Sequence, residues 1–201
     1  MMRLLFTAIF LILLSGTIMS QYPPYSCYSL TYKDTIFSEP QTGHYSFKNA
    51  AYLNGKTIYI YDNSSKRAVP QPGWQHVENW DEVSQFQKKR EDLIMKNLQE
   101  IINSNEGKFA FTLYIDCSIC PYKYLEVVRI FFLNGEKFIK TNKNMLAQTS
   151  HHPTAEMIKQ KLKQDKDALN QLNAYLEKQC PTKLQRYKTS YYSRLPRMGG
   201  K

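Results

Sequence analysis

Four cysteines are the residues of this sequence best suited to chemistry. They are Cys27, Cys117, Cys120 and Cys180, in a chain of 201 residues. In an oxidising compartment an even number of cysteines predicts two disulfides. The alternative is a redox or zinc motif at the C-x-x-C of Cys117 and Cys120. That motif usually opens a helix, whereas here it follows a strand-like segment, so disulfides are the better prediction.

The beginning of the chain predicts export, and hence oxidised cysteines. Met1-Met2-Arg3 is a short basic start, and an apolar run follows over residues 4–19. Because Ser20 places a small residue at the expected cleavage point, residues 1–20 are predicted to be a secretory signal peptide. The alternative is a membrane anchor, but a span needs about 20 apolar residues and this run is shorter. We therefore expect a secreted, extracellular protein.

Other reactive residue types give weaker signals. Asn63-Ser64-Ser65 is a sequon and predicts an N-linked glycan at Asn63. The pair His151-His152 has no carboxylate or thiolate at ligand spacing, so we expect a solvated loop there and no metal site. No Ser/His/Asp or Cys/His arrangement stands out, so we expect neither an enzyme nor a cofactor.

The charge of the chain is +10, with 27 basic and 17 acidic residues. Its excess lies near the end, where six basic residues and no acidic one follow Pro181. The remainder is only mildly basic, so we expect no nucleic-acid partner. The basic tail over residues 191–201 suggests retention on heparan sulfate or another anionic surface. The alternative is that this tail has no function and is the remnant of a truncated reading frame.

The pattern of the chain is strands followed by a helix, twice. Asn54-Gly55 and Asn134-Gly135 are hairpin signals between strand-like runs. The predicted strands are residues 28–32, 44–53, 57–61, 109–117, 123–133 and 136–141. This pattern predicts an α+β protein in which the two halves share one sheet.

Apolar spacing predicts one long helix in each half. Residues 74–103 lack Gly and Pro and carry an apolar stripe that includes Ile94 and Leu98. Residues 153–187 carry a second stripe, in which Leu176 and Cys180 lie one turn apart. With both helices laid on the same face of the sheet, they would border a groove whose floor is the sheet.

Several motifs resemble the antigen-recognition platform of the MHC class I family. Trp74, Glu78-Asn79-Trp80-Asp81 and residues 87–92 resemble its first helix, and residues 174–181 through Tyr187 resemble its second. The likeness is closest to the soluble zinc-α2-glycoprotein branch of the family. It implies an eight-stranded antiparallel sheet carrying two long helices.

The resemblance also implies a domain layout. We expect a platform over residues 21–190, with halves at about 21–106 and 107–190, then the basic tail. The family's immunoglobulin-like third domain has no counterpart in this sequence, so we expect the platform to stand alone.

The resemblance implies both disulfides. The family joins the positions of Cys117 and Cys180, tying the second helix to the floor. If the first strands of the two halves are antiparallel neighbours, as in the family, facing residue numbers have a constant sum. Placing Leu30 opposite Cys117 then places Cys27 opposite Cys120, which predicts the second bond. The alternative is two unpaired thiols.

The same alternation divides the floor between two faces. Leu30, Tyr32, Leu113 and Ile115 fall on the groove side, with Asp34 as the polar exception. The residues between them, on the lower face, are largely polar. A polar lower face suits contact with water, so we expect no β2-microglobulin partner.

The resemblance argues against conventional peptide presentation. The tyrosines that bind a peptide's amino end in the family are partly kept, as Tyr32, Tyr175 and Tyr187. The alternative is that these tyrosines only pack against other groove residues. At the carboxylate end Lys161 is kept, but the tryptophan position is Leu162. Without those donors a buried carboxylate would lose hydrogen bonds worth about 1–3 kcal/mol each.

A small amphipathic ligand is the favoured occupant. Arg90 lies one turn before Ile94 on the apolar stripe, where a soluble member of the family has a groove arginine associated with a non-peptide, hydrophobic ligand. The alternative is an arginine that reaches solvent or pairs with Asp34 or a helix-borne acid.

Two functions follow from this resemblance. The first is a secreted, non-classical carrier of a small hydrophobic or lipid-like ligand, with an immune or lipid-related role. The second is a soluble ligand or decoy for an immune-cell receptor, with a closed groove. The expected groove residues are Tyr32, Asp34, Arg90, Ile94, Leu113, Ile115, Lys161, Leu162, Tyr175 and Tyr187.

Overall fold

A computed structural model describes residues 27–39, 44–103, 109–120, 125–142, 145–148, 156–157, 160 and 168–194. The predicted leader, the His151-His152 pair, Lys161 and Leu162 lie outside these residues. Eight strands form one antiparallel sheet in the order β4-β3-β2-β1-β5-β6-β7-β8. They are β1 (Tyr28–Glu39), β2 (His44–Leu53), β3 (Lys56–Asp62), β4 (Arg67–Pro70), β5 (Phe109–Ile119), β6 (Glu126–Leu133), β7 (Glu136–Asn142) and β8 (Met145–Gln148).

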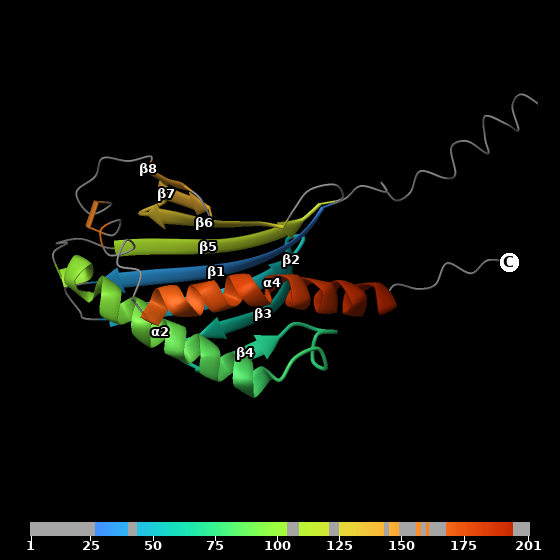
Figure 1. Ribbon diagram of the computed structural model, residues 1–201. Helices are drawn as coiled ribbons and strands as arrows, with labels where there is room; N and C mark the ends of the chain where they lie inside the picture. The colour runs from blue at the N-terminus through green and yellow to red at the C-terminus, as the bar shows by residue number, and fades with distance from the viewer. Residues whose placement is uncertain are drawn as a thin grey trace, which may run out of the picture.

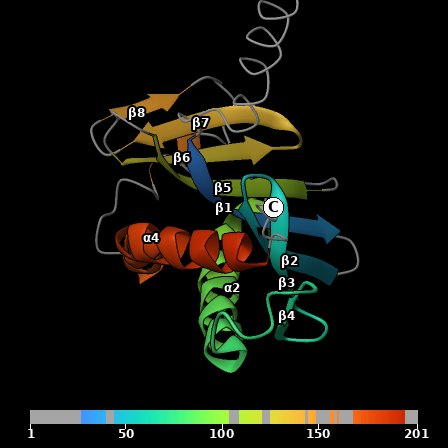
Figure 2. The ribbon, with the colours of Figure 1, turned by 90° about the vertical axis from the view of Figure 1, so that its right-hand side faces the viewer.

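Two long helices, α2 (Trp80–Asn103) and α4 (Ala168–Ser193), lie on the same face of this sheet (Figures 1 and 2). The eight-stranded antiparallel sheet with two helices confirms the expected fold class. The strands β4 and β8, of four residues each, complete the edges of the sheet but were not located by sequence pattern. Runs this short carry too few alternating positions to stand out.

The two hairpin signals act as expected. Asn54 and Gly55 have φ of 46° and 78°, and Asn134 and Gly135 have φ of 49° and 88°. Positive φ at both central residues is the geometry of the tight turn whose twist matches the flanking strands, and Asn-Gly adopts it at low cost. These turns set the register of β2 with β3 and of β6 with β7.

The centre of the sheet has the register that the family resemblance implied. Leu30 of β1 faces Cys117 of β5, and Tyr28 faces Ile119. The groove-side residues Leu30, Tyr32, Leu113 and Ile115 are all at most 3% exposed, so they form the core beneath the helices. This confirms the expected division of the two faces.

Two described helix boundaries differ from the expectation, while most of residues 153–167, where the second helix was expected to start, lie outside the described residues. The segment from Trp74 turns before α2 begins at Trp80, because Asn79 caps the helix: its Oδ1 accepts from the backbone N–H of Glu82. The other helix, α4, continues past Tyr187 to Ser193 and passes through Pro181. Residues 191–193, expected in the tail, are therefore helical.

Candidate functional site

A cavity of about 390 Å³ lies between α2 and α4 above the floor of the sheet. Its lining combines apolar side chains, tyrosines and a few polar groups from both helices, β1, β3 and the segment before α2. The lining residues are Tyr32, Tyr59, Glu78, Asn79, Glu82, Val83, Phe86, Gln87, Gln171, Leu172, Tyr175, Leu176, Lys183 and Tyr187.

The two helices run antiparallel past this cavity and contact each other along it. Contacts between early residues of one side and late residues of the other show this direction: Trp74 packs edge-on against Tyr187, and the Phe86 ring packs at a tilt against Tyr175. Between these pairs, Glu78 accepts hydrogen bonds from Lys183 at 3.1 Å and from an arginine of α4, Arg186, at 3.0 Å. The cavity is thus bounded along its length by contacts that join the helices.

Phe86 and Tyr175 line the cavity and contact each other across it. Their ring centroids lie 5.5 Å apart, one ring from each helix, although Tyr175 remains 49% exposed. Val83, Leu172 and Leu176 supply further apolar lining. This arrangement leaves a partly open apolar space between the helices, with one aromatic side chain, Tyr175, at the surface.

The charged lining residues Glu78, Glu82 and Lys183 gather at one end of the cavity. Lys183 and Glu78 are paired there, and the Lys183 side chain is 19% exposed. The hydroxyl of Tyr32 is buried and has no hydrogen-bond partner among the described residues. Burial is the largest cause that raises the pKa of Tyr32 above its ordinary value, so the phenol stays protonated and can donate. An unpaired donor on a residue that lines an apolar cavity suits a ligand with one polar group.

Two further tyrosines, Tyr59 and Tyr187, are also buried at this site. Gln87 donates a hydrogen bond of 2.9 Å to the Tyr59 hydroxyl. Burial is the main cause that raises the pKa of Tyr59 and of Tyr187 above the ordinary range. Tyr32, Tyr59 and Tyr187, called here the three buried tyrosines, are therefore neutral at physiological pH.

Arg90 is not at the rim of the groove, as the favoured expectation had it. It is fully buried, and its Nη2 and Nη1 donate to the two carboxylate oxygens of Asp34 at 2.5 and 3.0 Å. Gln87 and Asn173 accept further bonds from the same guanidinium, and Asn49 donates to Asp34. The alternative prediction, that Arg90 pairs with Asp34, is therefore confirmed. A buried guanidinium is costly unless an opposite charge pairs with it, and the Asp34 carboxylate on the floor of the sheet provides that charge.

The remaining expected groove residues divide into two groups. Ile94, Leu113 and Ile115 are each 1% exposed and belong to the core next to the cavity rather than to its lining. Lys161 and Leu162 lie outside the described residues. Tyr32, Tyr175 and Tyr187 do line the cavity, as expected.

Several residues that line the cavity were not predicted from the sequence. Phe86 lies one turn before Arg90 and two turns before Ile94, so the helical period could have placed it on the same face. Glu78 and Lys183 are 105 residues apart and carry no local signal of their pairing. Such a contact emerges only when the two halves are assembled.

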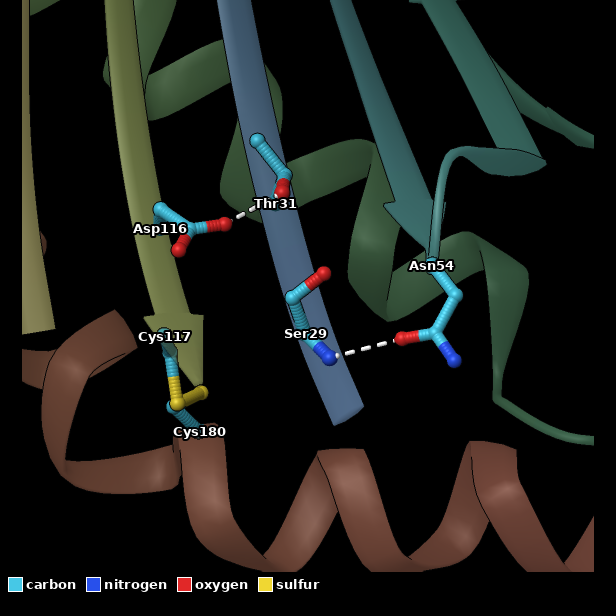
Figure 3. The surroundings of a disulfide bond; sticks show 6 residues. All are labelled: Ser29, Thr31, Asn54, Asp116, Cys117 and Cys180. Atoms are coloured by element: carbon cyan, nitrogen blue, oxygen red, sulfur yellow. Dashed lines mark hydrogen bonds between the residues drawn. A yellow bond between two sulfur atoms is a disulfide. The ribbon is translucent and has the colours of Figure 1, made fainter. Parts of the chain in front are cut away.

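Both expected disulfides are present. Cys117, near the end of β5, is bonded to Cys180 of α4 and ties that helix to the floor (Figure 3). Cys27 and Cys120 are bonded one residue beyond the paired ends of β1 and β5. The described part of the chain has no free cysteine, which confirms the predicted pairing and leaves no thiol there for redox chemistry.

Asn63 lies in the turn between β3 and β4, where the sequon residues Ser64 and Ser65 are exposed. The Asn63 side chain accepts a hydrogen bond from the backbone N–H of Phe47 and donates to the carbonyl of Tyr45. A glycan here remains a prediction. Elsewhere in the described residues, no group of three or more His, Cys, Asp or Glu side chains could hold a metal ion.

Comparison with known proteins accounts for this architecture. A family profile described as class I histocompatibility antigen, domains alpha 1 and 2, matches residues 26–193. Zinc-alpha-2-glycoprotein of Bos taurus is 31% identical over 183 residues, which cover 88% of this chain and 61% of the relative. The Homo sapiens protein of the same name is 28% identical over 193 residues, with 93% and 65% covered.

A more distant relative is the IgG receptor FcRn large subunit p51 of Mus musculus. It is 24% identical over 159 residues, covering 77% of this chain and 44% of the relative. The chain thus spans about three fifths of the zinc-alpha-2-glycoproteins and less of FcRn. Across the described residues, no helix is both long and apolar enough to cross a membrane.

Proposed function

The chain belongs to the class I histocompatibility antigen family through its alpha 1 and alpha 2 domains, and from this premise we propose that it is a secreted, non-classical binding protein. Its cavity would hold a small hydrophobic or lipid-like ligand, in an immune or lipid-related role and without catalysis. The observation that carries this proposal is the apolar cavity of about 390 Å³ with an unpaired phenol on its floor.

The size of the cavity and the ring contact across it favour a small ligand over a peptide. Ligand pockets usually span about 300–1,000 Å³, so this cavity is at the small end of that range. An extended peptide needs an open path of about 3.3 Å per residue along the groove. Phe86 and Tyr175 cross that path with ring centroids 5.5 Å apart.

The distribution of polar groups favours an amphipathic ligand. The apolar part would lie against Val83, Leu172 and Leu176, where contact excludes water. A polar head would accept a hydrogen bond from Tyr32, and a carboxylate head would be attracted to Lys183. Glu78 and Glu82 line this end together with Lys183, and Arg186 also pairs with Glu78, so the charges there are balanced and Lys183 is the lining cation that a carboxylate head would meet.

The test is displacement of a fluorescent fatty acid from protein secreted by mammalian cells and delipidated by organic extraction. Val83→Trp fills the cavity and should weaken binding at least tenfold, whereas Gln85→Trp, on the exposed side of α2, should leave it unchanged. Equal binding by the two variants, or no binding by the unmodified protein, would refute the carrier function.

A receptor ligand with a closed groove is the second candidate. It is favoured by contacts of α4 with α2 and with the segment before it: Phe86 with Tyr175, Arg90 with Asn173 at 3.3 Å, and Glu78 with Lys183. A helical pair joined in this way offers a rigid upper surface without any ligand. Saturable cell binding that survives Val83→Trp would favour this function over the carrier.

The lower face of the sheet supports the absence of β2-microglobulin, although less uniformly than expected. At its centre Thr31 donates to Asp116 at 2.5 Å, and Lys33 lies over the ring of Tyr114. At the β3–β4 edge, however, Ile60 and Val69 are 40% and 53% exposed on that face. We expect no stable complex when the two chains are secreted together, which size-exclusion chromatography would check.

A further inference from the structure

A second hollow, of about 270 Å³, lies at the end of the sheet beside the last turn of α4. The Trp74–Tyr187 ring pair stands between it and the groove cavity, since Trp74 lines the former and Tyr187 the latter. Two cations, two aromatic rings and two uncharged polar side chains dominate its lining. The lining residues are Lys56, Thr57, Gln71, Pro72, Trp74, Tyr191 and Arg194.

Each cation of this hollow is held by an aromatic ring rather than by a carboxylate. The Lys56 ammonium lies 4.6 Å from the centroid of the Tyr191 ring and donates to its hydroxyl at 2.5 Å. The Arg194 guanidinium lies 4.1 Å from the centroid of a Trp74 ring. A cation–π contact restrains a cation but does not neutralise it, so both positive charges remain available.

The guanidinium of Arg194 is also fixed from its other side. Its Nε donates to the carbonyl of Ser190 at 2.8 Å, which caps the C-terminus of α4. Gly73, with φ of 87°, lets the backbone approach so closely that a Cβ there would collide with Nη1 of Arg194. Within the described chain, Nη1 and Nη2 have no hydrogen-bonded carboxylate, so they can meet an anion.

A third cation extends the positive surface beyond the hollow. Lys188 lies 4.0 Å from the centroid of the Tyr28 ring, and Tyr28 shares a hydrogen bond with Tyr192. Tyr192 in turn packs edge-on against Tyr191 of the hollow. In the sequence no acidic residue follows Glu177, while further basic residues come after Arg194. The positive charges therefore extend over a longer surface than a single small ion could cover, which suits a polyanion.

We propose that Lys56, Lys188 and Arg194 form a binding site for a sulfated glycosaminoglycan chain. Their side chains would pair with sulfate groups, and Thr57 and Gln71 would bond to sugar hydroxyls. The two disulfides belong to an oxidising compartment, and there sulfated glycans are the repeating polyanions that the protein meets. The site is separate from the groove and does not depend on its ligand.

The experiment measures binding of a heparin-derived octasaccharide to the full chain at about 150 mM salt. Lys56→Ser with Arg194→Ser should raise the dissociation constant by about tenfold, since each exposed charge contact is worth a few-fold in affinity. The matched control is Lys88→Ser with Lys89→Ser, two exposed lysines of α2, which removes the same charge at another place. It should change the dissociation constant less than twofold.

Three outcomes would overturn the proposal. Equal losses in the two double variants would mean that only net charge matters. Equal binding of a desulfated octasaccharide would mean that sulfate is not recognised. Binding to phosphatidylserine vesicles without binding to the octasaccharide would assign the surface to membranes. Thermal unfolding of each variant, expected within a few degrees of the unmodified chain, excludes misfolding as the cause.

Discussion

The buried pair of Asp34 and Arg90 gives the strongest prediction about stability. Both side chains are at most 1% exposed, and the pair shares two hydrogen bonds. Removing one partner leaves the other charge buried and uncompensated, which typically costs about 3–5 kcal/mol. Replacing both by apolar residues of similar size removes the two charges together. Asp34→Leu and Arg90→Met should therefore each be severe, and the double variant much less so than their sum.

The magnitude can be worked from the contacts that each change leaves. Asp34→Leu deprives the guanidinium of both carboxylate oxygens and leaves it Gln87 and Asn173; it also leaves Asn49 without the acceptor of its amide. We expect a coupling energy of at least about 2 kcal/mol between the two sites, within the range for groups in one network. At about 2–4 °C per kcal/mol, each single variant should melt roughly 10 °C lower.

The assay is urea unfolding at pH 7 with disulfides intact, followed for the single and double variants. The matched control is the exposed pair of Arg67 and Asp81, 3.9 Å apart with side chains 75% and 85% exposed, which should couple by less than about 1 kcal/mol. Additive costs at Asp34 and Arg90 would refute the reasoning. If the double variant were stable but no longer bound the fluorescent fatty acid, Arg90 would have a ligand role after all.

Three further predictions concern the disulfide, the tyrosines and the glycan. Replacing Cys117 and Cys180 together by alanine should lower the free energy of unfolding by about 4 kcal/mol in the chain-entropy model, given a separation of 63 residues; an effect under about 1 kcal/mol in urea unfolding would contradict it. The three buried tyrosines have pKa values raised by burial. Their contribution to the free energy of unfolding is therefore fully present below about pH 10, the pKa of tyrosine in the unfolded chain. As pH rises further the unfolded chain loses protons that the folded chain keeps, and the free energy of unfolding falls by up to about 1.4 kcal/mol per pH unit for each. The phenolate absorbance of these three tyrosines, the last part of the total, should then appear together with loss of near-ultraviolet circular dichroism, and ionisation of all tyrosines in a folded protein would be inconsistent with this. Ser65→Ala removes the sequon but keeps the Asn63 amide, so the shift in mobility produced by a glycosidase should vanish; a shift that persists would place the glycan elsewhere.

Local signals in the sequence were sufficient for much of the fold. The Asn-Gly turns, the alternation of the central strands and the helical stripe of Ile94 and Leu98 each depend on residues close in the chain. The register of β1 with β5 needed one assumption from the family resemblance, after which the Cys27–Cys120 bond followed. These features are set by periodicity and turn geometry, which a single sequence displays.

The site was harder to predict because its contacts join distant segments. Arg90 was placed on the correct helix face, but whether it reaches a ligand or Asp34 depends on the depth of the groove floor. The ring pair of Phe86 and Tyr175 depends on how closely the two helices approach. Likewise α4 continues past Tyr187 because Tyr191 packs partly buried against the core, a tertiary effect.

Native mass spectrometry of the chain secreted from mammalian cells tests the central claim most directly. The account predicts that the unmodified protein and Gln85→Trp carry a non-covalent apolar adduct that organic extraction removes, and that Val83→Trp carries none. A protein whose mass is the same before and after extraction, with no fatty-acid displacement afterwards, would contradict it.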